Sequence, residues 1–517
     1  MKSRIIKGIA LSLAVAFVAT SCSKDDDPIS VTGIQVEQSQ ALVRVGATTQ
    51  LQASITPVDA SVKTIEWMSR NANRATVDAN GLVTGVSTGK VWIVATASAT
   101  ALKDSCEVTV AAPQATETLS GNITASRTLS AGKTYILDGW VYVKDGATLT
   151  IEPGTIIKGK SATKASLIIE RGAKLIAEGT KDKPIIFTSD KDPGQRATGD
   201  WGGIILCGKA TINVAGGEGI IEGGVGSTYG GGTSPNDNDN SGILRYIRIE
   251  YAGYAFEKDK EINGLTFGGV GKGTVVENIQ VSFANDDSYE WFGGTVNVKN
   301  IVALGGLDDD FDTDFGFNGF VQFALSLRNP DVADAASKSN GFESDNDGSG
   351  TTNSPKTNPR FANVSIYGPK AVTTGTINQY YQSAMHIRRN SDLQAYNSVF
   401  AGWPTGVKID DSKGAAGSNA ALKGCIIAGM DNNYATDAAN TWFNTSGWSN
   451  RVATIADLKV TSFSITNPNF LPQTGSALLT GSVTVPTGLE QTDYIGAFKN
   501  SDWTAGWAEW NPQAAIY

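Results

Sequence analysis

Short runs of alternating apolar and polar residues follow one another closely between residues 31 and 110. Examples are "ALVRVG" from Ala41, "TIEWMS" from Thr64 and "KVWIVATA" from Lys90, and turn residues separate the runs. A series of about seven such runs within about 80 residues is typical of a β-sandwich.

Beyond residue 117 the pattern changes to strand and turn units that repeat with glycine at regular offsets. "GATLTIEPGTIIKG" begins at Gly146, and "GAKLIAEGTKDKPIIF" begins in the same way at Gly172. The sequence VENI at 276–279 returns as VKNI at 298–301. Strand-rich units with a period of about 20 to 30 residues predict a solenoid, and no stretch after residue 21 has sustained helical periodicity.

Both regions resemble known families. The segment Ile65–Ala97 resembles the bacterial Ig-like domain of group 2, with Trp67 at the core tryptophan and residues 77–89 matching "VD.NGLVTGV..G". Such domains mostly act as stalks. The repeating units resemble a single-stranded right-handed parallel β-helix of the pectate-lyase-like kind. We therefore expect an all-β chain, with an Ig-like β-sandwich at 31–111 and the β-helix at 117–517.

Residues 1–21 have the pattern of an export signal. Basic residues precede an apolar segment from Ile9 to Val18, which is too short to span a bilayer. The residues from Ala19 to Cys22 resemble a lipobox, in the looser form that Bacteroidota lipoproteins often have. This resemblance implies that residues 1–21 are a lipoprotein signal peptide and that Cys22 is lipidated.

The next stretch, residues 22–30, is an acidic linker that contains "SKDDD". It resembles the tag that sends lipoproteins of that phylum to the outer face of the outer membrane. "DWGGIILCGKA", "RYIRIEYAG" and the ending "YIGAFKNSDWTAGWAEWNP" further resemble Bacteroidota and marine bacterial lipoproteins with no settled activity. Together these resemblances imply a lipid-anchored protein exposed on the outer membrane surface.

Composition and charge narrow the chemistry. The net charge of −9 disfavours nucleic acid as a partner and suits cations or neutral ligands. Because His386 is the only histidine, histidine-rich zinc sites, histidine-ligated haem and most histidine-based triads are disfavoured. Cys106, Cys207 and Cys425 lie among apolar residues, which predicts buried thiols and no disulfide framework.

The segment from Phe283 to Gly319 gathers eight carboxylates around one lysine. Rungs of a β-helix stack about 4.8 Å apart, so the interval between VENI and VKNI would bring several of these carboxylates into pairs. Two like charges about 5 Å apart repel by roughly 3 kcal/mol at an effective dielectric near 20. Calcium prefers such oxygen ligands. The expected pairs are Asp286 under Asp308, Asp287 under Asp309 and Glu290 under Asp312, and the predicted calcium ligands are these six with Asp310 and Asp314.

Two short acidic loops, 236–242 and 343–350, also have calcium-like sequences. Asp and Asn readily fill tight corners, and we expect that role for both loops. The tryptophans Trp503, Trp507 and Trp510 near the end of the chain are expected to cover the open end of the solenoid.

A catalytic role is the alternative for the acidic segment. Polygalacturonase-like hydrolases use a trio of aspartates on adjacent rungs, and 285–287 has part of that pattern without the accompanying Gly-His-Gly motif. Calcium-dependent lyases of this fold instead use Arg or Lys to remove a proton next to a uronate carboxylate. The available bases are Arg328, Arg388, Arg389 and Lys408, for which we expect pairing with acids or a solvated position, and we assign no catalytic residue.

The sequence thus predicts a surface lipoprotein that binds an extracellular ligand, with a glycan as the expected ligand, through a calcium-stabilised β-helix. The first alternative is a polysaccharide lyase or hydrolase, because a fold alone does not fix an activity. The second is an adhesin or an accessory subunit of a TonB-dependent nutrient-uptake complex.

Overall fold

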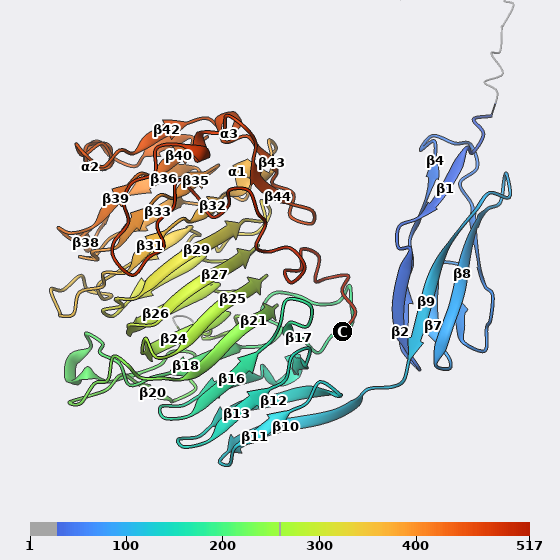
Figure 1. Ribbon diagram of the computed structural model, residues 1–517, viewed down its shortest axis with the longest axis horizontal. Helices are drawn as coiled ribbons and strands as arrows, with labels where there is room; N and C mark the ends of the chain where they lie inside the picture. The colour runs from blue at the N-terminus through green and yellow to red at the C-terminus, as the bar shows by residue number, and fades with distance from the viewer. Residues whose placement is uncertain (1–27, 258–259) are drawn as a thin grey trace, which may run out of the picture. The chain divides into compact units, whose positions relative to one another are not determined.

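The computed structural model describes residues 28–257 and 260–517, and nearly all of its regular structure is β-strand (Figure 1). The chain divides into two compact units, one ending at Pro113 and the other running from Gln114 to Tyr517. The predicted signal peptide, Cys22 and the acidic linker up to Asp27 lie outside the described residues. Within the described ranges, no helix has the length and apolar character needed to cross a membrane.

The first unit is a β-sandwich, as predicted. Its core buries Val43, Val83 and Ile93 between the sheets. Gly81 forms a tight turn at φ +84°, where an added Cβ would lie 2.9 Å from the Trp67 ring. The glycine in the matched pattern of residues 77–89 is therefore needed both for the turn and for the close approach of the tryptophan. The strands are β1 (Gly33–Val36) with β4 (Ala53–Thr56), then β2 (Gln40–Arg44), β9 (Lys103–Ala111), β8 (Gly89–Ala97) and β5 (Ile65–Ser69), and finally β3 (Thr48–Gln50), β7 (Leu82–Gly85) and β6 (Ala75–Val77).

The second unit is a parallel β-helix, in which each strand pairs with a strand one rung further along. Leu149 pairs with Leu175 and Val276 pairs with Val298, so both predicted repeat intervals are confirmed. The first rung begins at Ala115, slightly before residue 117. Its early strands are β10 (Ala115–Ile123), β11 (Arg127–Leu129), β12 (Lys133–Val143), β13 (Thr148–Ile151), β14 (Ile156–Gly159), β16 (Lys174–Glu178) and β17 (Ile185–Ser189).

One side of the β-helix, which we name face 1, carries the acidic segment. It is a column of short parallel strands, each paired with the next. These strands are β15 (Ser166–Ile169), β18 (Gly203–Cys207), β24 (Leu265–Val270), β26 (Tyr289–Gly294), β28 (Phe311–Asp314), β30 (Phe342–Ser344), β33 (Ser383–Ile387), β36 (Thr405–Lys408) and β41 (Asn432–Tyr434).

Between successive face 1 strands the chain runs along a second stretch that bends at one residue, which we name the corner. Corner residues have φ between +47° and +59°, a region that Asn tolerates better than most residues, and they are Tyr246, Asn278, Asn300, Phe323, Asn363 and Asn397. The bent stretches are β21 (Gly242–Glu250), β25 (Val275–Ser282), β27 (Asn297–Leu304), β29 (Phe320–Leu327), β31–β32 (Arg360–Ala362, Ser365–Tyr367), β34–β35 (Gln394–Tyr396, Val399–Ala401) and β39–β40 (Ala421–Lys423, Ile426–Ala428), and β42 (Arg451–Ala453) follows.

Stacked aromatic rings fill the interior behind the acidic segment. The ring centroids of Tyr289 and Phe311 are 5.7 Å apart, and those of Phe311 and Phe342 are 5.6 Å apart. Because side chains alternate along a strand, these inward rings force their strand neighbours outward. The three cysteines of the described chain are buried and free, which confirms the prediction of isolated thiols.

The C-terminal segment 483–517, which we name the strap, runs along the side of the β-helix and not across its end (Figure 1). Trp503, Trp507 and Trp510 pack on outward apolar residues after the corner, such as Leu304 and Leu327. The expectation that they cover the open end is therefore wrong, because this side of the rungs is itself apolar and needs a cover. In the described part of the chain, three short α-helices precede the strap: α1 (Pro369–Val372), α2 (Asp437–Phe443) and α3 (Ile455–Leu458).

Candidate functional site: the charged column of face 1

Face 1 presents one outward residue per rung in a continuous column of charged and polar side chains. Strand pairing fixes the order directly, because each residue of the column is the register partner of the next. From the lower rungs to the upper ones the column is Thr266, Glu290, Asp312, Glu343, His386 and Lys408. The predicted stacking of Glu290 and Asp312 is thus confirmed.

The lower rungs bring carboxylate oxygens together in two groups. Asp286, Asp287 and Asp308 form one group, and Asp287, Glu290 and Asp312 form the other, with all ligand atoms of a group within 4.8 Å of one another. Asp287 belongs to both groups. Its Oδ1 also accepts a hydrogen bond of 2.8 Å from the backbone N–H of Asp309, which locks the turns of two successive rungs together.

An inserted segment covers this part of the column. Glu222 comes from the long connection between β18 and β21, and its Oε1 accepts a hydrogen bond of 3.0 Å from Asn263. The same amide of Asn263 also donates to Glu290. Burial raises the pKa of Glu222 to about 7. Periodicity could not have revealed Glu222, since it lies outside the repeating rungs.

The lower carboxylates are held in an environment that opposes their ionisation. Burial, followed by repulsion from neighbouring carboxylates, raises the pKa of each well above its ordinary value: Asp286, Asp287, Glu290, Asp308, Asp309, Asp312 and Asp314. Within the described chain, Oδ1 of Asp308 and Oδ1 of Asp312 are buried without a hydrogen-bond partner. Clustered carboxylate oxygens with free lone pairs are the donor set that a hard divalent cation such as Ca²⁺ prefers.

Three of the eight predicted ligands lie outside the two groups. Asp310 is fully buried and pairs with Arg328 at 2.9 Å, and the Arg328 guanidinium lies against the rings of Tyr381 and Trp403. Asp314 accepts a hydrogen bond of 2.6 Å from the backbone N–H of Phe315. Asp309 accepts from the backbone N–H of Asn340. A cation in the two groups would therefore meet the other five side chains.

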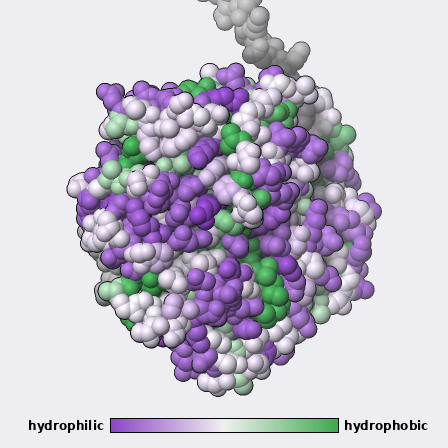
Figure 2. Space-filling model, turned by 60° about the vertical axis from the view of Figure 1, so that its left-hand side comes forward, coloured by the Kyte–Doolittle hydropathy of each residue, from purple (hydrophilic) through white to green (hydrophobic). Residues whose placement is uncertain are grey.

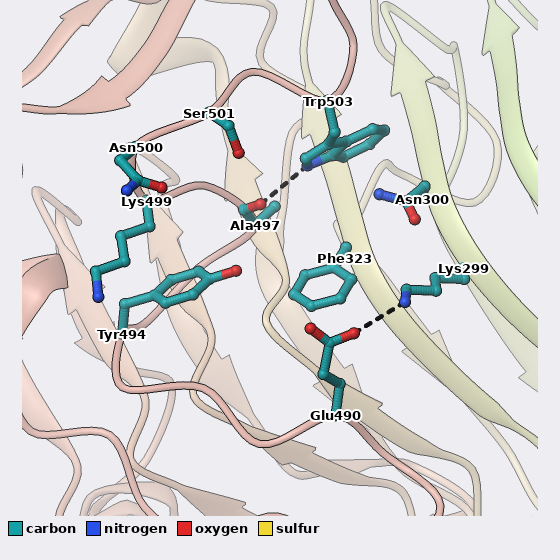
Figure 3. A pocket seen from close by; sticks show the side chains of 10 residues that line it. All are labelled: Lys299, Asn300, Phe323, Glu490, Tyr494, Ala497, Lys499, Asn500, Ser501 and Trp503. Carbon is teal, nitrogen blue, oxygen red and sulfur yellow. Dashed lines mark hydrogen bonds and ion pairs between the residues drawn. The ribbon is translucent and has the colours of Figure 1, made fainter.

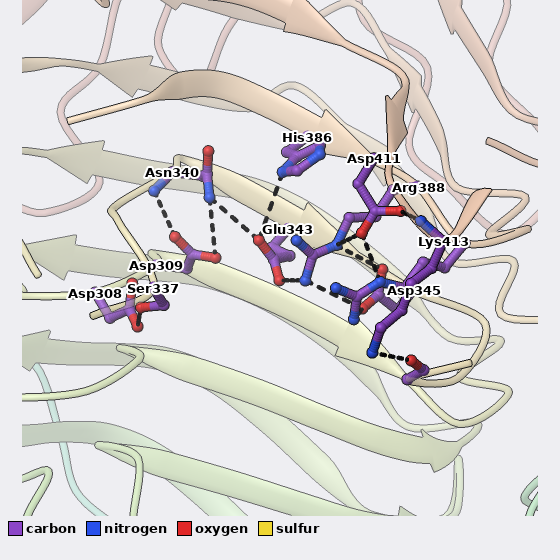
Figure 4. Close-up of polar contacts among 12 residues, drawn as sticks. Asp308, Asp309, Ser337, Asn340, Glu343, Asp345, His386, Arg388, Asp411 and Lys413 are labelled. Atoms are coloured by element: carbon purple, nitrogen blue, oxygen red, sulfur yellow. Dashed lines mark hydrogen bonds and ion pairs between the residues drawn. The ribbon is translucent and has the colours of Figure 1, made fainter. Parts of the chain in front are cut away.

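The upper rungs carry their own cations (Figure 4). Arg388 pairs with Glu343 and lies 2.9 Å from Asp345, while Arg389 bridges Asp345 at 2.8 Å and Asp411 at 2.7 Å. Burial alone would raise the pKa of Glu343, but the nearby His386 ring and the charge of Arg388 hold it below its ordinary value. Each of these upper carboxylates thus has an arginine partner within the protein.

The remaining sequence candidates occupy the roles expected of them, with one exception. In the two short loops, Asn236 accepts from the backbone N–H of Asn238 at 3.0 Å and Asp347 accepts from that of Ser349 at 2.9 Å, so both side chains stabilise tight corners. Lys408 was expected to pair with an acid or to be solvated. It is half-buried, and among the described residues its side chain makes no ion pair or hydrogen bond.

Comparison with known proteins gives two family matches. Residues 121–508 match the family described as "Pectate-lyase like beta helix domain", and residues 30–108 match "Bacterial Ig-like domain (group 2)". The first match supports a carbohydrate-active or carbohydrate-binding protein.

Matches to curated proteins are partial. A 3-O-alpha-D-galactosyl-alpha-L-arabinofuranosidase of Bifidobacterium longum is 42% identical over 89 residues, which are 16% of this chain and 8% of that protein. An uncharacterised protein of Clostridium acetobutylicum is 34% identical over 17% of this chain and 9% of its own length. An uncharacterised protein of Bacillus cereus is 31% identical over 16% of this chain and 64% of its own length.

The chain thus spans less than two thirds of the length of each of these relatives. The β-helix match, by contrast, covers most of the chain, and it agrees with the parallel register of the rungs. The chain belongs to the family of proteins with a pectate-lyase-like β-helix domain.

Proposed function

We propose that this protein is a lipid-anchored lipoprotein, exposed on the outer membrane surface, that binds an extracellular glycan, and that calcium stabilises its β-helix. The observation that carries the proposal is the clustering of the lower carboxylates around two buried members: Asp287 and Glu290 are only 7% and 8% exposed, while Asp286, Asp308 and Asp312 are partly exposed. A catalytic pair must meet its substrate, whereas a structural cation is best held away from water. The lower column therefore suits ion binding better than cleavage.

Surface chemistry supports a polar ligand. On the face shown in Figure 2, hydrophilic residues predominate and apolar residues form only small groups. Such a surface suits a glycan better than an apolar protein partner. The likeness of a short part of the chain to a glycan-cleaving protein of Bifidobacterium longum points to the same substrate class, although it covers 8% of that protein.

The second candidate is a polysaccharide lyase, and Lys408 is the observation that favours it. Burial, together with the charge of Arg388, lowers the pKa of Lys408 below its ordinary value, and a less protonated amine is a better base. The other three predicted bases are all held in ion pairs: Arg328, Arg388 and Arg389.

One assay, applied to the wild type and to a Lys408 variant, tests the proposal against this alternative. The full chain is incubated with polygalacturonate, and unsaturated ends are followed by absorbance. We expect none to form. Steady product formation that disappears in Lys408→Met would replace the binding assignment by the lyase.

The location is tested on intact cells. External protease should digest the wild-type protein, and Cys22→Ala should release it or leave it unprocessed, because the acyl chains that anchor it are attached to that thiol. Complete protection of the wild type in intact cells would contradict surface exposure.

A further inference from the structure

A cavity of about 250 Å³ lies between the strap and the corner of the rungs (Figure 3). The rungs contribute Lys299, Asn300 and Phe323, and the strap contributes Glu490, Tyr494 and Trp503. This cavity is separate from the charged column, since its residues belong to β27, β29 and the strap and not to face 1.

The strap is fastened to the rungs on both sides of the cavity and also at its rim, where Glu490 pairs with Lys299 at 2.9 Å and exchanges two backbone hydrogen bonds with the Gln322 side chain. Above it, the side chain of Asn363 donates to the carbonyl oxygens of Tyr494 and Gly496, at 3.2 Å each. Below it, Arg248 donates to the carbonyl oxygen of Trp507 at 2.6 Å. Between these anchors, residues 499–501 and Trp503 line the cavity, while Phe498 is buried against the rungs.

Asn300 is one of the polar residues of the cavity whose side chain lacks a hydrogen-bond partner among the described residues. Asn300 is the corner residue of its rung, at φ +58°. The corner residue of the next rung is Phe323, and that of the rung after it is Asn363, at φ +53°. The Asn363 side-chain amide binds the strap, but that of Asn300 makes no hydrogen bond to any residue in the described ranges. A half-buried amide with both a donor and an acceptor available is suited to adjacent hydroxyl groups of a ligand.

Three aromatic rings form part of the wall. Figure 3 shows Tyr494, Phe323 and Trp503 arranged around the space that Asn300 faces. Trp503 is fixed by its indole N–H, which donates to the carbonyl oxygen of Ala497 at 2.9 Å, and by stacking on Phe498 and Trp507. Its ring is therefore held in place before any ligand arrives, whereas Tyr494 has no such stacking partner among the described residues. The C–H faces of a sugar ring are apolar and pack well on such preorganised rings.

The charges in the cavity cancel. Lys299 pairs with Glu490 at 2.9 Å, and Lys499 pairs with Asp493 at 2.6 Å. Both pairs are largely exposed and can exchange their contacts for hydroxyl groups without leaving an unbalanced charge. A neutral ligand fits this site better than an anionic one, and the net charge of −9 favours the same choice.

A second cavity of about 250 Å³ adjoins the first, and Lys299 lines both. Leu489 and Phe320 border this second space. Each volume is slightly below the range of about 300 to 1,000 Å³ typical of small-molecule pockets, so each is of a size for one small ring.

From these contacts we infer that the groove under the strap binds a short neutral oligosaccharide, with one sugar ring against Tyr494, Trp503 and Asn300 and the next beyond Lys299. This inference rests on the proposed glycan-binding function and gives it a location. Neither calcium nor face 1 takes part in it.

The test begins with an array of neutral and uronate-containing oligosaccharides probed with the full chain, followed by titration of the strongest neutral ligand. Asn300→Gly keeps the corner conformation and removes the amide, and Tyr494→Ala removes one ring. Each should weaken binding by about tenfold or more. The matched control is Asn278→Gly, which makes the same change at φ +57° one rung earlier, outside the cavity, and should bind within about twofold of wild type.

The outcomes separate this inference from the proposed function. Binding of a neutral oligosaccharide that Asn300→Gly and Tyr494→Ala leave unchanged would overturn the location while the glycan-binding function stands. Binding of uronate oligosaccharides alone would overturn the neutral assignment. Absence of binding to any oligosaccharide would overturn both. Tyr494→Phe, which keeps the ring, should retain binding and shows that the alanine variant acts through the lost ring.

Discussion

The lower and upper rungs of face 1 place carboxylates at equivalent positions of one column but surround them differently. Glu290 and Asp312 are direct register partners that form no ion pair with a cation among the described residues, whereas Glu343, on the next rung, pairs with Arg388 and lies beside the His386 ring. The pKa of Asp312 is raised by burial and that of Glu343 is lowered. Buried carboxylates at equivalent strand positions can therefore be compensated in two ways. In the upper rungs a cationic side chain of the protein pairs with them, and in the lower rungs we propose that a bound cation or protons do so.

The largest effect on the free energy of unfolding is expected from breaking the buried ion pairs of the upper rungs. Arg388→Ala would leave Glu343 and Asp345 without their main partner, and both are mostly buried, with side-chain exposures of 17% and 8%. Removing one partner of a buried ion pair costs about 3 to 5 kcal/mol. Urea unfolding measures the loss.

The control for that variant is Lys160→Ala, which breaks a pair with Asp138 in the same β-helix but at exposures of 39% and 30%. It should change the free energy of unfolding very little, because surface pairs contribute little. Equal losses in the two variants would contradict the distinction between a buried and an exposed pair.

Removing calcium should destabilise the lower rungs next most strongly. An ion that binds only the folded state stabilises it by about 2.7 kcal/mol at a hundredfold excess over its dissociation constant. Adding a chelator in place of calcium should therefore lower the melting temperature of the full chain, as followed by circular dichroism. A melting curve unchanged by the chelator would remove calcium from the proposal.

A smaller effect should come from neutralising the shared carboxylate. Asp287→Asn combined with Asp309→Asn takes two like charges away from the lower rungs, and it should abolish most of the calcium dependence. In chelator the variant should be more stable than wild type by about 1 kcal/mol, since repulsion is relieved and an amide oxygen can still accept the backbone hydrogen bond.

Asp314→Asn serves as the comparison for this double change, because Asp314 lies outside both carboxylate groups. It should retain the calcium dependence of the wild type. If Asp314→Asn removed the dependence and the double change kept it, the ion would lie elsewhere on face 1.

The sequence predicts which residues stack in the lower rungs but not in the upper ones, because the spacing between rungs differs. From Glu290 to Asp312 the repeat is uninterrupted, so the interval between VENI and VKNI finds the partner. From Asp312 the next partner is Glu343, and from Glu343 it is His386, because loops of different length intervene. Because loops of unequal length shift the spacing, the sequence did not reveal that His386 stacks on Glu343 or that Arg388 pairs with Glu343.

Asp310 illustrates a second limit. Its neighbours in sequence belong to the acidic segment, yet its side chain is buried against Arg328, and both are fully buried. Charge density along the chain does not reveal which way a turn residue points. The all-β fold, by contrast, follows from alternation and repeat length alone, and the corner asparagines follow from backbone conformation.

The last and smallest effect concerns pH. Raised pKa values mean that, between about pH 4 and the raised value, the folded protein binds more protons than the unfolded chain, so its stability falls as pH rises through that window. For Glu222 the window ends at about pH 7.

Bound calcium would favour the ionised form of these carboxylates, so protons compete with calcium for them. The increase in melting temperature caused by calcium should therefore be smaller at about pH 5 than at about pH 8, and the Asp287→Asn, Asp309→Asn variant should flatten the difference. A calcium effect of equal size at both pH values would mean that the ion binds groups already ionised, such as the exposed acids outside face 1, and the contrast between the two halves of the column would then lose its physical basis.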